Sequence, residues 1–397
     1  MTRIALVEPD GAGGMIHYAH QLAGALTDAG AEVTLHTARR YELRHLPHRF
    51  TVRAEMSLWP AIEPAARHRL GAAGRKLRRG WRGVRYAVVW HHLTRRLIAE
   101  RPDVVLFSTI RFPFQAVFLR RLRRRGLVLA QVCHEFEARE RGLLSRAISR
   151  QLSLTVYRSF SRVFLHGEEN RKAFLEAYPV DLAVTRVIPH GNQSLFLRIA
   201  DAGGELRSRY GIDDQEPVAL FFGGLRPSKG ILDLVDAFAA MPPGTPGRLL
   251  IVGHPSGVDP AVVVERAVKA GIADRVVVDG RYLPLEEVGP LVRSCTFMVL
   301  PYRSATASGV LQVAFTFARP VVATALGALT EDVDHGMTGL LVQAGDDEGL
   351  ARAMASLLTD PGRARAMGSA AAEAAENRFG WGPIAETVLA GLEKVTG

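Results

Sequence analysis

Short runs of apolar residues recur along the chain, and stretches with helical spacing separate them. The first run, 3–7, leads into a glycine-rich turn and then into apolar residues at helical intervals between 16 and 26. Runs without internal polar alternation are typical of strands in a parallel sheet that is covered on both faces. The first series predicts strands at 3–7, 32–36, 103–107, 127–132, 163–165 and 184–188.

A second series begins after a weakly patterned stretch near 192–212. It predicts strands at 218–222, 248–252, 275–279, 296–300, 320–323 and 339–342, and helices at about 231–240, 259–270, 284–293, 308–318 and 347–358. Two consecutive strand–helix series predict an α/β protein with two Rossmann-like, doubly wound domains. Because ligands bind beyond the carboxyl ends of such strands, we expect a central substrate cleft that the two domains face.

Length and cysteine content narrow the class of protein. At 397 residues, the chain is longer than one hydrophobic core usually supports. No apolar stretch approaches the roughly 18 residues needed to cross a bilayer, and Glu8 and Asp10 interrupt the start too early for a secretory signal. The two cysteines, Cys133 and Cys295, lack the spacing of a disulfide scaffold or a structural zinc site. These features predict a cytoplasmic protein.

Positive charge is concentrated in the first half of the chain. The net charge is +10, yet the first 200 residues carry 33 Lys and Arg against 16 Asp and Glu. The excess lies mostly in 65–125, where the basic clusters 75–82 and 120–125 accompany Trp81 and Trp90. This pattern predicts contact with an anionic membrane surface, and a solvated basic surface is the alternative. No nucleic-acid-binding module accompanies the charge, so we expect no nucleic-acid partner.

Two glycine-containing turns follow predicted strands and suit anion binding. In the turn 11–14, Gly13 and Gly14 would let a ligand approach the backbone and a helix N-terminus, although a plain tight turn is equally compatible. In the turn 222–230, Arg226 offers a planar guanidinium and Lys229 a compact cation beside a helix N-terminus. That placement predicts a diphosphate site, with two solvated charges as the alternative.

Two further segments carry candidate binding groups. Ser308 and Gly309 would begin a helix whose backbone N–H groups could hold an anion, and an ordinary capped helix is the alternative. His134 follows a predicted strand and could contact a sugar hydroxyl or transfer a proton, unless it is a packing residue. Asp332 and Asp334 have the spacing of a metal-binding pair, but helix capping is the simpler interpretation. We therefore expect no metal.

Together these motifs resemble the retaining glycosyltransferases of family 4, which have the GT-B architecture. The resemblance rests on segments spread over almost the whole chain: 11–14, 134–135, 187–192, 226–230, 308–324 and 379–381. It implies an acceptor-binding domain over 1–194, a nucleotide-sugar domain over 195–375, and a C-terminal helix over 376–397 that crosses back to the first domain.

The resemblance also implies a role for each candidate residue. Arg226 and Lys229 would clamp the donor diphosphate in place of a metal ion, and His134 would approach the transferred sugar. Donor-binding contacts would come from Gly13, Gly14, Gly224, Ser308, Gly309, Val310 and Gln312. Front-face attack, assisted by the leaving phosphate, would retain the anomeric configuration without a protein nucleophile.

The chain departs from the family pattern at three positions. The family usually has two glutamates eight positions apart, and Ser304 and Gln312 stand there instead. Gln312 can still bond a ribose hydroxyl, but without the charge that strengthens such a bond. Gly224 occupies a position where the family often has arginine.

These observations predict a retaining, metal-independent glycosyltransferase that uses a nucleotide-diphosphate sugar and no cofactor. The basic region favours a lipid-linked or membrane-surface glycan acceptor and a peripheral position on the inner face of the membrane. A small soluble acceptor, such as a secondary metabolite, is the first alternative. A non-catalytic member that binds a sugar nucleotide or a partner protein is the second.

Overall fold

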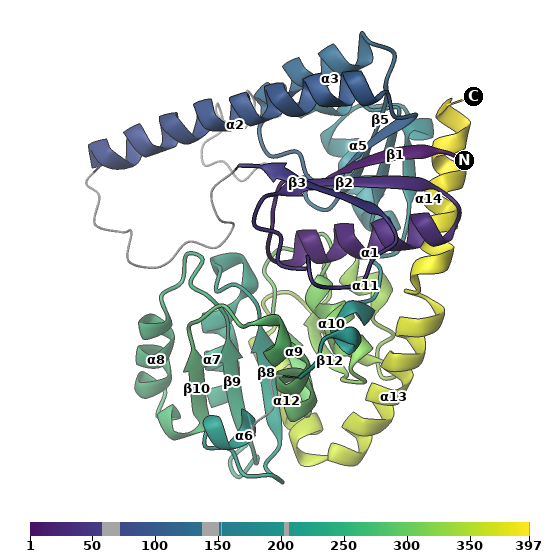
Figure 1. The fold of residues 1–397 in the computed structure, drawn as a ribbon. Helices are drawn as coiled ribbons and strands as arrows, with labels where there is room; N and C mark the ends of the chain where they lie inside the picture. The colour runs from purple at the N-terminus through teal and green to yellow at the C-terminus, as the bar shows by residue number, and fades with distance from the viewer. Residues whose placement is uncertain (58–71, 137–150, 152, 202–205, 397) are drawn as a thin grey trace. The chain divides into compact units, whose positions relative to one another are not determined.

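The chain forms two units, each built around its own parallel sheet. The computed structural model describes residues 1–57, 72–136, 151, 153–201 and 206–396 (Figure 1). Unit 1 consists of Met1–Pro189 together with Trp381–Gly397, and unit 2 consists of His190–Gly380. The predicted functional limits 1–194, 195–375 and 376–397 stay predictions.

Unit 1 contains a seven-stranded sheet in the order β3-β2-β1-β4-β5-β6-β7, whose described pairings are parallel. Its strands are β1 (Arg3–Val7), β2 (Glu32–Ala38), β3 (Thr51–Met56), β4 (Val104–Phe107), β5 (Val128–Cys133), β6 (Arg162–Leu165) and β7 (Thr185–Val187). Its helices are α1 (Gly14–Asp28), α2 (Ala72–Glu100), α3 (Ala116–Arg123), α5 (Glu168–Ala177) and α14 (Trp381–Thr396). All six predicted strands of the first series are confirmed.

Strand β3 was not predicted. It lies at the edge of the sheet beside β2, and most of its side chains are exposed or only half-buried. An edge strand needs no continuous apolar run, because one side of its backbone faces outward. Its sequence therefore lacks the pattern that identified its neighbours.

The long helix α2 covers the sheet of unit 1 with one apolar side. Tyr86, Trp90 and Leu97 are fully buried, and the Trp90 ring stacks at 5.6 Å on the ring of Phe107 from β4. The last helix, α14, packs on α1, β5 and β6 (Figure 1). Among the residues that the structure describes, no helix combines the length and apolarity required to cross a bilayer.

Unit 2 contains a six-stranded parallel sheet in the order β10-β9-β8-β11-β12-β13. Its strands are β8 (Val218–Phe222), β9 (Arg248–Val252), β10 (Val276–Asp279), β11 (Phe297–Leu300), β12 (Val321–Thr324) and β13 (Gly339–Val342). Its helices are α6 (Leu206–Arg209), α7 (Ile231–Ala239), α8 (Pro260–Lys269), α9 (Leu285–Ser294), α10 (Gly309–Thr316), α11 (Leu329–Asp332), α12 (Asp347–Thr359) and α13 (Pro361–Asn377). The six predicted strands and five predicted helices are confirmed.

Each sheet has one point where the strand order reverses. In unit 1, β1 lies between β2 and β4; in unit 2, β8 lies between β9 and β11. The turns that leave two neighbouring strands at such a point diverge to opposite faces of the sheet and leave room for a ligand. The turns after β1 and β4 and the turns after β8 and β11 are therefore the places in these sheets where a ligand can bind.

Candidate donor site and the network after strand β1

The turn after β8 is held tightly against the turn after β11. Gly230 ends a short 3₁₀ turn, Pro227–Lys229, with a left-handed φ of 65°. A Cβ at Gly230 would lie 1.9 Å from the Pro301 carbonyl oxygen, so only glycine fits there. The Arg303 N–H also donates to the Ser228 carbonyl at 2.9 Å. The backbone thus fixes the position of Lys229 relative to the segment after β11.

Lys229 is linked to the start of α10 through Tyr302. Its Nζ atom lies 3.4 Å from the centroid of the Tyr302 ring, a cation–π contact. The Tyr302 hydroxyl lies 3.3 Å from Ser308 Oγ, which accepts a hydrogen bond from the Leu311 N–H at 3.2 Å. Ser308 is therefore the N-cap that the sequence predicted. Tyr302 was missed, although it follows β11 by two positions.

The first turn of α10 contains backbone N–H groups that donate to no described residue. Ser308 uses the Leu311 N–H, and no described residue accepts from the N–H of Gly309 or Val310. Gly223 has a φ of 126°, and a Cβ added to it would lie 3.7 Å from Val310 Cγ2. The turn after β8 and the first turn of α10 are therefore in contact. Two N–H groups and the Lys229 ammonium gather where an anion would be stabilised.

Arg226 and Arg303 are the two guanidinium groups of these turns, and they are held differently. Arg303 forms a two-pronged ion pair with Asp233 of α7, with both distances 2.6 Å, so its charge is already compensated. Arg226 is exposed at the start of the 3₁₀ turn; burial lowers the pKa of His254, and the charge of Arg226 lowers it further. Of these two guanidinium groups, that of Arg226 is the exposed one, and its predicted binding of the donor diphosphate stays a prediction.

Gln312 is the predicted binding residue with the least accessible side chain. It is fully buried, and neither amide atom has a hydrogen-bond partner among the described residues. A buried amide without partners costs about 1–3 kcal/mol, and such groups are rare in folded proteins. The amide can meet a ribose hydroxyl only if neighbouring side chains shift, so this role stays a prediction.

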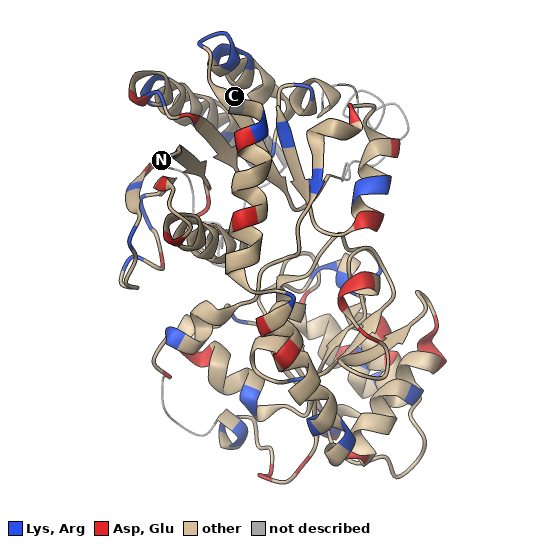
Figure 2. Ribbon diagram, turned by 90° about the vertical axis from the view of Figure 1, so that its right-hand side faces the viewer, with Lys and Arg blue, Asp and Glu red and all other residues tan. Residues whose placement is uncertain are grey.

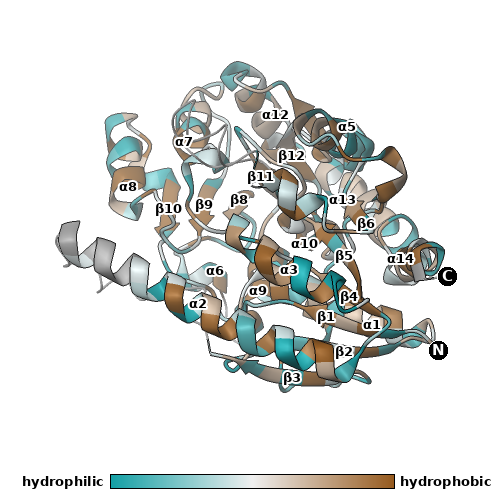
Figure 3. Ribbon diagram, turned by 90° about the horizontal axis from the view of Figure 1, so that it is seen from above, coloured by the Kyte–Doolittle hydropathy of each residue, from teal (hydrophilic) through white to brown (hydrophobic). Residues whose placement is uncertain are grey.

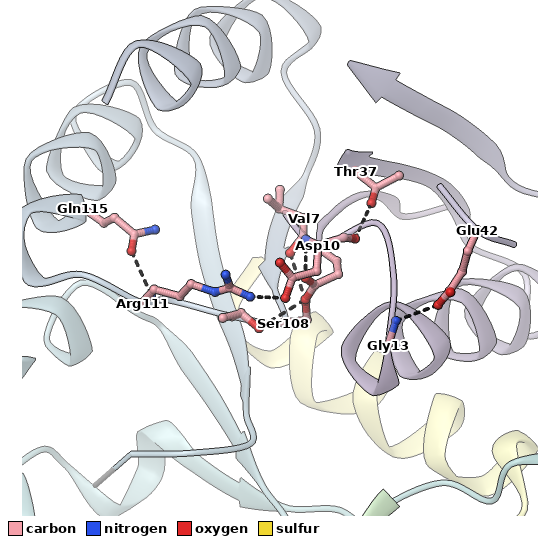
Figure 4. A network of polar contacts seen from close by, with 10 residues as sticks. Val7, Asp10, Gly13, Thr37, Glu42, Ser108, Arg111 and Gln115 are labelled. Carbon is pink, nitrogen blue, oxygen red and sulfur yellow. Dashed lines mark hydrogen bonds and ion pairs between the residues drawn. The ribbon is translucent and has the colours of Figure 1, made fainter. Parts of the chain in front are cut away.

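The turn after β1 carries a buried polar network that the sequence analysis did not identify (Figure 4). Glu8 is fully buried; it accepts hydrogen bonds from the Asp10 N–H at 2.7 Å and from the Ser108 hydroxyl. Burial raises the pKa of Glu8 to about 7, with the Asp10 carboxylate adding to the effect. Asp10 forms an ion pair with Arg111, which follows β4. The network therefore joins the two strands at the reversal point of this sheet.

The glycine-rich turn 11–14 packs beside that network. A Cβ at Gly11 would lie 1.9 Å from the Arg40 carbonyl oxygen, and Gly13 has a φ of 90°. The Gly13 N–H donates to Glu42 Oε1 at 2.6 Å (Figure 4). Gly14 is exposed, and a Cβ added there would meet no atom within 4 Å. The close packing at Gly11 and the positive φ of Gly13 thus explain these two glycines without a ligand. Ligand binding by Gly13 and Gly14 stays a prediction.

His134 lies after β5 in an aromatic cluster. Its Nδ1 atom lies 3.2 Å from His166 Nε2, and its ring meets the Tyr18 ring edge-on at 4.5 Å. The Trp381 ring also meets the Tyr18 ring edge-on, at a centroid distance of 5.0 Å. These contacts fix the orientation of the imidazole. The structure places His134 in unit 1 and brings Arg226, Lys229, Ser308, Gly309 and Val310 together in unit 2.

The acidic pair near α11 has a different role from the predicted one. Asp332 is the last residue of α11, and Asp334 pairs with Arg378 at 3.1 Å. Neither side chain caps the N-terminus of a described helix, and α11 has Ala328 at its N-cap without a side-chain bond, so the capping prediction is wrong. Burial raises the pKa of Asp332 to about 7.

Comparison with known families agrees with this arrangement. The family model described as Glycosyltransferase Family 4 matches residues 12–192, and that described as Glycosyl transferases group 1 matches residues 216–360. The first model begins within the turn after β1, and the second covers the turns after β8 and β11. The chain belongs to the family 4 glycosyltransferases.

Curated relatives of this family 4 chain are similar over part of their length. The D-inositol 3-phosphate glycosyltransferase of Rhodococcus erythropolis is 32% identical over 239 residues, which cover 59% of this chain and 53% of that protein. The N-acetyl-alpha-D-glucosaminyl L-malate synthase of Bacillus anthracis is 29% identical over 154 residues, 39% of each chain. The chain spans about half the length, or less, of these curated relatives.

Solved structures match over the whole chain. Sucrose-phosphate synthase from Thermosynechococcus elongatus has a TM-score of 0.75 at 21% identity and covers 100% of this chain and 99% of its own. Anabaena Alr3699/HepE in complex with UDP-glucose has a TM-score of 0.70 at 18% identity and covers 99% and 100%. At these identities the likeness shows the fold, which is the GT-B class with two Rossmann-like domains. The predicted fold class is confirmed.

Proposed function

We propose that this family 4 glycosyltransferase transfers a sugar from a nucleotide-diphosphate sugar to a hydroxyl acceptor. The observation that carries the proposal is the convergence of Lys229, the Ser308-capped helix α10 and the exposed Arg226 after β8 and β11. Two cations and two unused N–H groups complement the charge of a diphosphate. The complexes of Alr3699/HepE with UDP and UDP-glucose support a donor of this class.

The reaction would proceed with retention and without a metal ion. The bond between the anomeric carbon and the diphosphate breaks, and the acceptor oxygen bonds to the same face of that carbon. The acceptor proton passes to an oxygen of the leaving diphosphate. Arg226, Lys229 and the Gly309 and Val310 N–H groups would stabilise the charge that develops on the leaving group, the task that a metal ion performs in other enzymes.

Unit 1 would supply the acceptor site. The Asp10–Arg111 ion pair lies at the reversal point of its sheet, and its partly exposed carboxylate and guanidinium groups can orient hydroxyls. His134, fixed by His166 and Tyr18, would contact the transferred sugar. We propose a lipid-linked or membrane-surface glycan as the acceptor. The named substrates of the curated relatives favour a small soluble acceptor as the second candidate.

The outer faces of α2 and α3 support a membrane-bound acceptor. Trp81, Val84 and Val88 follow one another at helical spacing on α2 and are 60%, 66% and 50% exposed. Helix α3 packs beside α2 (Figure 3) and exposes Val117. Arginines of the segment 120–125 form a basic end to α3 (Figure 2). Exposed apolar residues next to arginines fit the interface of an anionic bilayer.

The structure describes only part of the predicted basic cluster 75–82. The side chains of residues 75–79 lie outside the described residues, and the described part of the cluster contributes Trp81 and Arg82. We name Trp81, Val84, Val88, Val117 and the arginines of 120–125 the α2–α3 surface. We propose that it places the protein on the cytoplasmic face of the membrane.

The donor proposal is tested by a thermal-shift and turnover screen with UDP-glucose, GDP-mannose, ADP-glucose and dTDP-glucose, with EDTA present. A nucleotide sugar at 100 times its Kd should add about 2.7 kcal/mol to the free energy of unfolding. We expect one donor to raise Tm and to be consumed when acceptors are supplied. Binding without turnover by any acceptor would favour the non-catalytic alternative, and no binding would refute the donor site.

The membrane proposal is tested by flotation with vesicles of phosphatidylcholine and 30% phosphatidylglycerol, a composition on the order of natural anionic surfaces. The triple variant W81S/V84S/V88S should float at least about fivefold less than the wild type, because interfacial apolar contacts add to the electrostatic attraction. The matched control is V262S/V264S/V268S on α8, whose valines are 45%, 47% and 58% exposed. Equal flotation of both variants, or none by the wild type, would contradict the proposal.

A further inference from the structure

His254 stands beside the proposed donor clamp, and no role has yet been assigned to it. It follows Gly253 at the carboxyl end of β9, the strand next to β8. Its carbonyl accepts from the Leu225 N–H at 2.9 Å, and the Leu225 carbonyl accepts from the Ser256 N–H at 3.1 Å. The turn after β9 is thus hydrogen-bonded to the turn that carries Arg226.

The imidazole fits against Gly224 because that residue has no side chain. A Cβ at Gly224 would lie 3.2 Å from His254 Cε1 and 3.6 Å from Ser256 Oγ, so a larger residue would have to displace the ring. His254 Nε2 lies 3.3 Å from Ser256 Oγ. The ring also meets Tyr282, from the turn after β10, edge-on at 6.0 Å. Three turns therefore hold the imidazole at the same end of the sheet as Arg226.

Partial burial and the charge of Arg226 both disfavour the protonated form of His254. Burial is the larger cause of its lowered pKa, and the nearby Arg226 guanidinium is the second. A diphosphate bound to Arg226 would cancel that repulsion and attract a positive imidazole instead. The pKa of His254 should therefore rise when an anion occupies the clamp.

We propose that His254 is a third diphosphate-binding side chain, which takes up a proton from solvent when the donor binds. The inference rests on the proposed function and adds a residue to the donor site. In this binding step, one proton moves from the buffer to the imidazole, and no covalent bond of the donor changes. The groups that face the ring are Arg226, Ser256 and Tyr282 from the three turns.

The test is calorimetric titration in two buffers that differ in ionisation enthalpy. The probe is whichever of UDP-glucose, GDP-mannose, ADP-glucose and dTDP-glucose stabilises the wild type most; their diphosphate diesters do not titrate between pH 6 and 8. Wild-type binding should take up close to one proton, and Kd should rise up to about tenfold per pH unit between the free and bound pKa values of His254. His254→Gln should bind without proton uptake and with a Kd that is flat over this range.

Ser256→Ala is the matched control, since it removes a neighbour of the ring but keeps the imidazole. It should retain the proton uptake, and thermal melting of both variants confirms that they fold. Wild-type binding without proton uptake, or undiminished uptake by His254→Gln, overturns the role of His254 and leaves the donor site standing. Failure of the wild type to bind every probe overturns the proposed function itself, and this inference with it.

Discussion

Replacing Lys229 by alanine should lower kcat/KM for glycosyl transfer at least about a hundredfold while the protein stays folded. Loss of one preorganised donor to the developing charge of a leaving group typically costs 10²- to 10³-fold. Lys229 is half-buried against the Tyr302 ring, so its ammonium is held in place before the donor arrives. The measurement is steady-state turnover of the donor that the screen identifies.

The matched control for this prediction is Lys269→Ala. Lys269 ends α8, and its Nζ bonds to Glu265 at 2.7 Å on an exposed surface of the same unit. Such surface pairs contribute little to stability, so this variant should keep wild-type activity. A Lys229→Ala enzyme that is as active as the control would refute the clamp.

Gly230→Ala should lower the free energy of unfolding by about 3 kcal/mol or more. The added Cβ would lie 1.9 Å from the Pro301 carbonyl oxygen, and the backbone φ of 65° is already unfavourable for alanine. The turn must move to relieve the overlap, and Lys229 moves with it, so donor binding should weaken as well. Urea denaturation followed by circular dichroism measures the change.

Gly244→Ala separates the overlap from the backbone conformation. Gly244 has a φ of 81° and open space where its Cβ would lie, so only the conformational penalty of about 1 kcal/mol applies. The losses in the free energy of unfolding caused by Gly230→Ala and Gly244→Ala should therefore differ by about 2 kcal/mol or more. Equal losses of stability would mean that the backbone around Gly230 and Pro301 relaxes to admit the added Cβ at no cost in free energy.

The central strands could be predicted because complete burial leaves a signature in the sequence. Strands such as β4 and β8 lie between two covering layers, so nearly every residue in them is apolar. The edge strand β3 is half exposed and leaves no such pattern. The edge strands β7, β10 and β13 were nevertheless predicted, so the lack of an apolar run in β3, and not its place at an edge, explains why it was missed.

The convergence of the turns after β8 and β11 could be expected from the sequence, because the parallel topology brings the carboxyl ends of neighbouring strands together. Arg226 and Lys229 lie in the first of these turns, and Ser308 ends the second; their role as a donor clamp stays a prediction. Tyr302 and His254 were missed because their roles depend on which side chain each one meets. The Asp10–Arg111 ion pair joins residues about a hundred positions apart, a distance over which spacing carries no information.

The assignment of α14 to unit 1 sets an order for folding during synthesis. Arg162 in β6 donates to the Gly391 carbonyl at 3.0 Å, and a Cβ at Gly391 would lie 3.0 Å from the Phe164 ring, so this helix seals the sheet that the first half of the chain begins. Residues 190–380 leave the ribosome before it does. Unit 2 can therefore complete its core first. The apolar side of β6 stays uncovered until α14 has been synthesised. A truncation that removed only the last turns of the chain would thus damage the unit that was made first.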